Sequence, residues 1–208
     1  MLITDIKKDK KHYFLIEFSD GTEELIDKTV CAEYRLCKGE ELSSVKLSEI
    51  LKRSQFVRCK ERALWYLDRC DRTERELARK LKEASFSEKI IAEVMAFLKS
   101  YALIDDRRYA ARFAERNTEM NVSKREIRAK LYTKGINRDI IDEILENTAV
   151  NEHEQITALI EKKYRSKLTD KNSVAKVYAA LCRKGFSFSA VRDVLKQYSE
   201  ELQYSEEY

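Results

Sequence analysis

The chain has 208 residues, of which 43% are hydrophobic and 38% are charged, and it contains no proline. This length allows one or two compact domains, and the apolar fraction is sufficient for a core. No apolar run approaches the roughly 20 residues of a transmembrane helix. The N-terminus lacks the uncharged stretch and cleavage site of a signal peptide. We therefore expect a cytoplasmic protein with no membrane segment.

The cysteines and histidines do not suggest a metal site or a disulfide framework. The five cysteines are odd in number and form no C-x-x-C motif, which is typical of reduced thiols in the cytosol. The two histidines, His12 and His153, are far apart in the sequence and remote from any cysteine pair. We expect no metal and no cofactor.

The net charge of +4 is unevenly placed along the chain. It is −1 over residues 1–56, +3 over 57–104, and +1 over each of 105–149 and 150–208. The last segment is about +5 without the four glutamates of its final nine residues. This modest basic bias favours an anionic partner but falls short of a protein dedicated to coating DNA.

The N-terminal section is expected to be β structure. Residues 2–6 form a first candidate strand, residues 7–11 a charged turn, and residues 12–18 a second strand rich in aromatic and branched side chains. Asp20-Gly21 is a strong hairpin signal, and residues 23–26 would form the return strand. The pattern predicts a small three-stranded sheet.

Helices are expected from Asp27 onward. Asp27 is a candidate cap for a short helix to about Leu36, with Gly39 as its stop. Ser43 or Ser44 would cap a long helix that ends near Arg69. This long helix is expected to link the sheet section to the first of three repeated units and to form the first helix of that unit.

A fifty-residue repeat dominates the rest of the sequence. The segment Leu-Tyr-Thr-Lys-Gly-Ile at 131–136 returns as Leu-Cys-Arg-Lys-Gly-Phe at 181–186, and in weaker form as Leu-Lys-Glu-Ala-Ser-Phe at 81–86. A matched apolar pattern at one period predicts one helical unit used three times. We expect a mainly α fold of three tandem three-helix repeats in an elongated, curved array. Such an array favours a partner-binding protein over an enzyme.

Each repeat is predicted to contain three helices. The expected helices are 58–69, 73–84 and 87–100, then 106–117, 123–134 and 137–147, then 151–165, 171–184 and 187–199. The corresponding segments are 1–56 for the β section and linking helix, 57–104, 105–149 and 150–199 for the repeats, and 200–208 for an acidic, frayed tail.

Capping residues support these helices. The candidate N-caps are Asp71 or Thr73, Ser87, Asp105 or Asp106, Ser123 in a capping box with Glu126, Asn137, Asn151, Asn172 and Ser187. Gly135 and Gly185 lie where a helix ends in a left-handed residue. The first repeat has Ser85 there, so we expect its turn to be more strained or differently shaped.

No catalytic constellation is present. The chain has no nucleophile elbow, no Walker loop and no dinucleotide fingerprint, and four glycines cannot build a phosphate cradle. Asp105-Asp106 is compatible with an acidic metal site, but a helix cap with a first-turn acid is the favoured interpretation. The third helices carry few residues suited to reading bases, which disfavours sequence-specific DNA recognition. We expect a protein that is not an enzyme.

Basic residues recur on the second helices of the repeats. Those of the first repeat fall at spacings of three, four and three residues and predict one positive stripe. The candidate contact residues are Arg72, Arg75, Arg79 and Lys82, then Lys124, Arg128 and Lys134, then Arg183 and Lys184. A single stripe is usually a solvated face, whereas three favour an anionic protein surface or a DNA backbone. Most interleaved aromatic residues are assigned to the core, with Tyr132 as the exposed exception.

Several of these motifs together resemble the RecX family. In the first repeat they are Ala63-x-x-Tyr66-Leu67, Glu76-Leu77-x-x-Lys80-Leu81 and Leu103-Ile104-Asp105-Asp106-x-x-Tyr109-Ala110. The second repeat shows Ser123-Lys124-Arg125-Glu126-Ile127 followed by Lys134-Gly135-Ile136, and the third shows Lys176-Val177 followed by Arg183-Lys184-Gly185-Phe186. The match covers about residues 57–198. Asn121, where many relatives have glycine, and Ser85 are mild departures.

The resemblance implies a regulator of the RecA recombinase in DNA repair, recombination and the SOS response. RecX-like proteins bind the RecA filament on single-stranded DNA along its groove and suppress recombinase, ATPase and coprotease activity. The alternative is a helical protein that binds nucleic acid non-specifically. We expect a monomer, because no heptad seam calls for a dimer. The sequence leaves open whether contacts are mainly to RecA or to DNA, and whether the protein binds filament ends or grooves.

Overall fold

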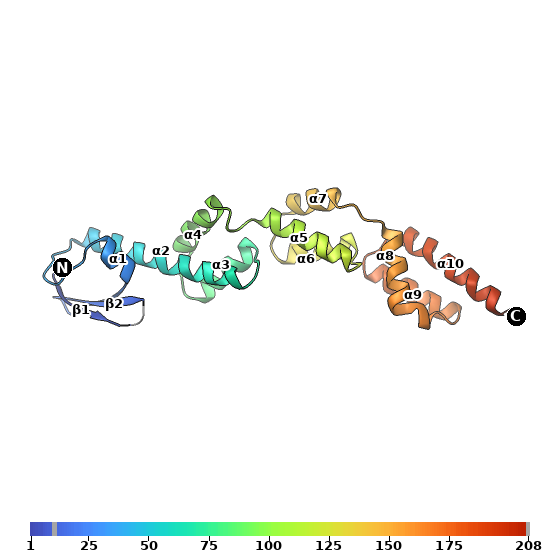
Figure 1. Ribbon diagram of the computed structural model, residues 1–208, viewed down its shortest axis with the longest axis horizontal. Coiled ribbons are helices and arrows are strands. Elements are labelled where there is room, and N and C mark those ends of the chain that lie inside the picture. Colours follow the sequence, from blue (N-terminus) through green and yellow to red (C-terminus); the bar gives the residue numbers. More distant parts are fainter. Residues whose placement is uncertain (10–11, 207–208) are drawn as a thin grey trace. The chain divides into compact units, whose positions relative to one another are not determined.

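The computed structural model describes residues 1–9 and 12–206. The chain forms two compact units, of which the first ends at Ile104 and the second begins at Asp105. The elements of each unit are shown in Figure 1. Each unit contains more than one hydrophobic core.

The first unit begins with the three-stranded antiparallel sheet that the sequence predicts. Its strands are β1 (Ile3–Lys8), β2 (Tyr13–Phe18) and β3 (Glu23–Asp27), in the order β1-β2-β3. The β2–β3 hairpin turns at Gly21, whose φ is +80°. The charged turn expected at 7–11 begins later, because Lys7 and Lys8 belong to β1, and its residues 10–11 lie outside the described part of the chain.

Two helices cover one face of this sheet. Helix α1 (Lys28–Glu33) is capped by Asp27, whose side chain accepts a hydrogen bond from the Thr29 backbone N–H at 2.8 Å. The chain leaves α1 through a left-handed residue, Arg35 (φ +54°), so the expected stop at Gly39 is wrong. Helix α2 (Ser44–Arg69) is capped by Ser43. Its N-terminal half packs on the sheet in a core of Ile3, Ile16, Phe18, Ile26, Val30, Ile50 and Val57.

The C-terminal half of α2 is the first helix of repeat one. It packs with α3 (Glu74–Glu83) and α4 (Glu88–Ser100) around a second core of Cys59, Ala63, Leu77, Leu81, Ile90, Val94 and Leu98. Thr73 caps α3 in a full capping box with Glu76, and Ser87 caps α4. Because α2 contributes to both cores, the sheet and repeat one share a continuous helix in this unit (Figure 1).

The turn between the second and third helices has one geometry in all three repeats. Ser85, Gly135 and Gly185 have φ values of +65°, +88° and +91°. In each case the following N–H bonds a carbonyl five residues back, at 3.2–3.3 Å. Of the two alternatives expected at Ser85, a differently shaped turn is therefore wrong. The turn has the same shape, and serine adopts there a left-handed conformation that costs a residue with a Cβ more than it costs glycine, as the alternative of greater strain requires.

The second unit begins with repeat two. Its helices are α5 (Asp106–Glu119), α6 (Lys124–Thr133) and α7 (Arg138–Asn147), capped by the predicted residues Asp105, Ser123 and Asn137. The capping box predicted at α6 is only half formed: Ser123 accepts from the Glu126 N–H, but the Glu126 carboxylate pairs with Lys130. Their core consists of Ala110, Ala114, Ile127, Leu131, Ile136, Ile141 and Leu145. At Asp105-Asp106 the favoured interpretation, a helix cap with a first-turn acid, is confirmed: Asp105 accepts from the N–H groups of Arg107 and Arg108, and Asp106 lies in the first turn of α5.

Repeat three differs from expectation in its first helix. Helix α8 (Glu152–Leu159) continues as a π-helical turn η1 (Ile160–Tyr164) and a 3₁₀ turn η2 (Arg165–Lys167), in place of one α-helix over 151–165. A π turn has one more residue in each hydrogen-bonded ring than an α-helix, and here it begins at Ile160, which is buried like the preceding Leu159. The apolar periodicity alone does not reveal that insertion.

Helices α9 (Lys171–Arg183) and α10 (Phe188–Glu206) complete repeat three. Asp170 caps α9 in a reciprocal pair with Ser173, so the predicted cap Asn172 is wrong. Helix α10 extends to Glu206, seven residues beyond the predicted end and through most of the segment expected to fray; residues 207–208 lie outside the described part. The core of repeat three includes Ile156, Leu159, Val177, Leu181, Phe186, Val191, Val194 and Tyr198.

Candidate partner-binding surface

Three of the four residues predicted for the first basic stripe lie on α3, and the fourth, Arg72, does not. Arg72 precedes the helix, which begins at Glu74. Its guanidinium turns back toward α2: Nε donates to the Tyr66 carbonyl oxygen at 3.4 Å, and the guanidinium carbon lies 5.6 Å from the centre of the Tyr66 ring. Arg75, Arg79 and Lys82 remain exposed along α3.

These three residues form one wall of a groove between α3 and α4. The groove has a volume of about 550 Å³ and is lined by Glu74, Arg75, Ala78, Arg79, Lys82, Glu88, Ile91, Ala92 and Met95. Its floor is apolar, because Ile91 and Met95 are buried and Ala78 is half-buried. A groove with an apolar floor and a basic wall fits a segment that carries both apolar and acidic side chains.

Carboxylates of the protein itself partly neutralise the basic wall. Lys82 Nζ lies 2.6 Å from Glu88 Oε1 across the groove mouth, and Arg79 Nε lies 3.7 Å from Glu83. The hydrogen bond to Lys82 lowers the pKa of Glu88, and the same bond raises the pKa of Lys82. Both residues are therefore charged at neutral pH. Arg75 makes no ion pair with any residue that the structure describes.

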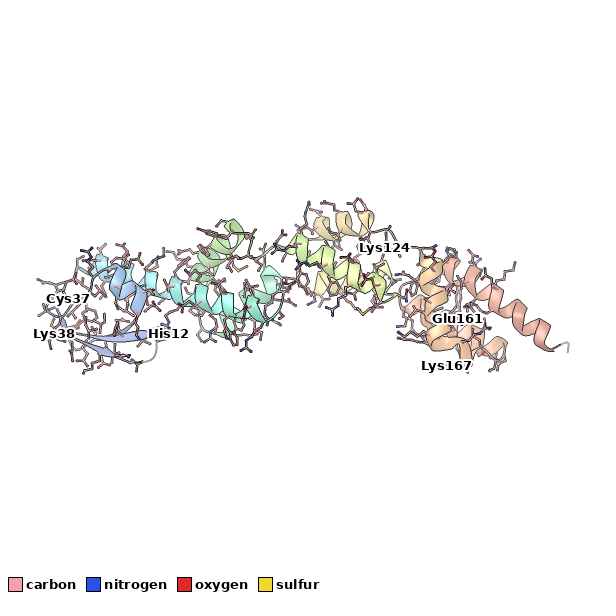
Figure 2. All side chains as sticks on the ribbon, viewed as in Figure 1. His12, Cys37, Lys38, Lys124, Glu161 and Lys167 are labelled. Carbon is pink, nitrogen blue, oxygen red and sulfur yellow. The ribbon has the colours of Figure 1, made fainter. Side chains whose placement is uncertain are left out.

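The basic residues of repeat two are engaged inside that repeat. Lys124, which is labelled in Figure 2, is the first residue of α6. Its Nζ donates to the Leu145 carbonyl oxygen at 2.7 Å and so satisfies an orphan carbonyl in the last turn of α7. Arg128 is ion-paired with Asp142 of α7. The Lys134 ammonium lies 5.4 Å from the Tyr109 ring centre and 5.9 Å from that of Phe113. These contacts give all three side chains a role in holding α5, α6 and α7 together.

Arg183 and Lys184 lie at the junction between repeats two and three. The backbone carbonyl of Lys184 accepts a 2.5 Å hydrogen bond from Ser123 Oγ, which also caps α6. Across the same junction, Gln155 Nε2 donates to the carbonyls of Thr118 and Val122. Arg183 is exposed. The junction therefore joins repeats two and three by polar contacts between backbone and side chain.

A second groove opens at this junction. It has a volume of about 810 Å³ and is lined by Lys124, Arg125, Val150, Glu152, Gln155, Gly185, Phe186, Ser187, Phe188, Ser189 and Arg192. Phe188 is 64% exposed, and Glu152 is bound to the N–H and the hydroxyl of Ser187 at 2.7 Å each. Arg125, Arg192 and Phe188 were missed as candidates, because Arg125 on α6 meets Phe188 and Arg192 of α10 in one groove only where the turn at Gly185 packs against Ser123 and Arg125.

Tyr132 is 62% exposed, as the aromatic pattern predicts. Another exposed aromatic residue, Trp65 on α2, is absent from the candidates chosen by sequence and is 44% exposed. Its position between two arginines, at Arg62 and Arg69, is the signal that could have identified it.

The described residues show no cluster suited to metal binding or catalysis. In that part of the chain, no group of three His, Cys, Asp or Glu side chains is placed to hold a metal ion. Burial raises the pKa of the Cys31 and Cys59 thiols to about 11, so both are protonated at neutral pH. Among the described helices, none combines the length and apolar character needed to cross a membrane.

Comparison with known proteins matches each repeat to a separate family model. The models describe the first, second and third three-helix domains of RecX and match residues 59–98, 105–145 and 151–195. The chain belongs to the RecX family. The matched segments coincide with the three three-helix cores, which confirms a mainly helical fold of tandem RecX repeats behind a small sheet.

RecX relatives cover most of the chain. The regulatory protein RecX of Clostridioides difficile (strain 630) is 35% identical over 83% of this chain and 82% of its own length. That of Streptococcus sanguinis (strain SK36) is 33% identical over 92% of this chain and 75% of its own. A crystal structure of regulatory protein RecX covers 93% of this chain and 98% of its own with a TM-score of 0.70 and 29% identity. A crystal structure of RecX from Lactobacillus salivarius matches 72% of this chain and 97% of its own chain, with a TM-score of 0.62 and 26% identity.

Proposed function

We propose that this RecX family member is a cytoplasmic, non-catalytic regulator that binds the RecA filament on single-stranded DNA and inhibits its recombinase, ATPase and coprotease activities. Family membership supports the regulatory role, since the curated relatives are regulatory proteins. The protein would act as a monomer whose repeats, 57–104, 105–149 and 150–199, each meet the repeating surface of the filament. Many modest contacts along such a lattice sum to tight binding through effective concentration.

The α3–α4 groove carries this proposal. It combines an apolar floor with Arg75, Arg79 and Lys82, and Arg75 is not neutralised by any described carboxylate. The groove is therefore suited to an acidic segment of a protein partner. Arg183 is the most exposed candidate in repeat three, whereas Lys124, Arg128 and Lys134 would contribute indirectly by holding repeat two in shape.

A second candidate function is non-specific nucleic-acid binding. The observation that favours it is the junction groove, which is lined by the cations Lys124, Arg125 and Arg192 and by Phe188, whose side chain is exposed. A protein that works in this way loses affinity steeply as salt rises and requires no protein partner.

Titration into a DNA-dependent RecA ATPase assay separates these functions. The regulator should inhibit when far fewer copies than RecA protomers are present. The double variant Arg75→Glu, Arg79→Glu should raise the half-inhibiting concentration at least tenfold, because each reversal turns attraction into repulsion at the groove.

The matched control is Arg116→Glu, Arg138→Glu, which makes the same change in net charge at exposed sites outside the groove. It should inhibit like the wild type. If the groove variant also inhibits normally, the regulator function stands and the groove is not its contact. Inhibition that begins only when the protein is abundant enough to coat the DNA would instead establish the nucleic-acid binder.

A further inference from the structure

The C-terminal end of α2 carries an exposed aromatic side chain stacked with arginines. Trp65 is the single tryptophan of the chain and is 44% exposed. The guanidinium carbon of Arg69 lies 3.9 Å from the Trp65 ring centre, and that of Arg62 lies 5.6 Å from it. These residues occupy positions i−3, i and i+4 on one helix, so they share a face.

Tyr66 and Arg72 extend this cluster. The Tyr66 ring meets Trp65 edge-on, with ring centres 5.2 Å apart, and Arg72 lies over Tyr66 while donating to its carbonyl oxygen. We call Arg62, Trp65, Tyr66, Arg69 and Arg72 the arginine–tryptophan platform. Four of its residues lie on α2 and Arg72 follows that helix, whereas the groove of the proposed function lies between α3 and α4.

The arginines of the platform retain hydrogen-bonding capacity. None of the three forms an ion pair with a carboxylate among the described residues, even though Glu61 and Asp68 lie on neighbouring positions of α2. Residues 58–72 contain five basic and three acidic side chains, a net charge of +2. A guanidinium stacked on a ring keeps its edge N–H groups free to donate to anions.

We infer that this platform binds single-stranded nucleic acid, with an unpaired base stacking on Trp65 or on the guanidinium plane above it and the adjacent phosphate bonded to Arg62, Arg69 or Arg72. Exposed aromatic rings beside cations suit a single strand because every base has a stacking face and every phosphate a charge. A duplex hides its bases and does not satisfy the aromatic half of the platform. An acidic protein segment needs the cations but gains little from the exposed ring.

The single tryptophan provides a direct test on the full-length protein without RecA. Short oligothymidylate titrated at low salt should quench the Trp65 fluorescence, and a duplex of the same length should quench it less. In parallel, the anisotropy of a labelled oligothymidylate gives affinities for all variants. Trp65→Ala should weaken binding roughly tenfold, and Trp65→Phe, which keeps a stacking ring, should stay close to the wild type.

The control variant is Tyr132→Ala, which removes an aromatic residue that is 62% exposed on repeat two. It should bind the oligonucleotide like the wild type. Trp65→Phe keeps the test decisive if Trp65→Ala does not fold, since Arg69→Ala in the Trp65→Phe background should then weaken binding.

Two results would overturn the inference. One is equal affinity of wild type, Trp65→Ala and Arg69→Ala for oligothymidylate. The other is normal oligonucleotide binding by these variants together with lost inhibition of the RecA ATPase, which would assign the platform to a protein contact. Because the oligonucleotide assay contains no RecA, failure of this inference leaves the proposed regulatory function intact.

Discussion

Gly185 has two separate reasons to be glycine. Its φ of +91° is a conformation that residues with a Cβ rarely adopt. A Cβ built there would also lie 2.8 Å from Ser123 Oγ and 2.9 Å from Arg125 Cβ. The first reason concerns the turn of repeat three, and the second concerns its close approach to repeat two.

We predict that Gly185→Ala destabilises the protein by about 2–3 kcal/mol, because it combines backbone strain with overpacking at the junction. Gly39→Ala is the matched control: its φ is +88°, but nothing lies within 4 Å of the added Cβ. Gly39→Ala should lower the free energy of unfolding only by the backbone strain, about 1 kcal/mol. Urea denaturation of both variants measures the difference, and equal losses would show that the junction tolerates a methyl group.

At the scale of single elements, the groove between α3 and α4 is limited by one of its own ion pairs. Glu88 holds Lys82 across the groove mouth, and both side chains are largely exposed. An incoming acidic group must compete with Glu88 for that ammonium. The pair therefore weakens the binding of an acidic partner at the groove. Because the pair is exposed, it contributes little to the stability of the fold.

Glu88→Gln should therefore strengthen inhibition of the RecA ATPase, with a severalfold lower half-inhibiting concentration and an unchanged melting temperature. Protonation of Glu88 at low pH should likewise strengthen inhibition. The pKa of Glu88 lies below its ordinary 4.5, so the carboxylate is lost, and Lys82 released, only below that value. The control variant is Glu143→Gln. Glu143 lies on α7 and pairs with Arg107 of α5, so its substitution changes the net charge equally at a site outside the groove. If the two variants behave alike, the effect is one of total charge and the groove has no special part in it.

The elements also show what the sequence could predict. Caps were predictable because they depend on residues two or three positions apart: Thr73, Ser87, Asp105, Ser123, Asn137 and Asn151 all cap the expected helices. The error at α9 arose because Asp170 and Asn172 are both good caps, and the reciprocal bond with Ser173 decides between them. The π turn after Leu159 leaves no comparable local signal.

The candidate site was less predictable, because it depends on contacts between distant residues. Periodicity places Lys124 and Arg128 on an exposed face of α6. Only the packing of α7 shows that Leu145 and Asp142 engage them. Likewise, the spacing of Arg72 fits the α3 stripe, but Tyr66 draws its side chain away. Charge patterning identifies available cations and leaves their partners undetermined.

At the scale of the whole molecule, the chain divides after Ile104, and the second unit contains two repeats with separate cores. Hydrogen bonds from Ser123 to Lys184 and from Gln155 to Thr118 and Val122 join them. Gln155 is only 5% exposed, so these bonds are shielded from water and costly to leave unmade. Repeats two and three should therefore unfold as one cooperative unit.

We predict that a fragment of residues 105–208 folds alone and melts in a single transition, whereas a fragment of residues 105–149 is largely unfolded. The shorter fragment is below the size at which a single core is usually sufficient, and it leaves the carbonyls of Thr118 and Val122 without Gln155. Far-UV circular dichroism with thermal melts tests both.

Ser123→Ala in the longer fragment removes the α6 cap and the bond to Lys184 together, so it should lower the free energy of unfolding by about 2 kcal/mol. Thr133→Ala, whose hydroxyl bonds only within α6, should cost much less. A stable shorter fragment, or two separate transitions in the longer one, would mean that the repeats fold independently and that the junction positions them without stabilising either.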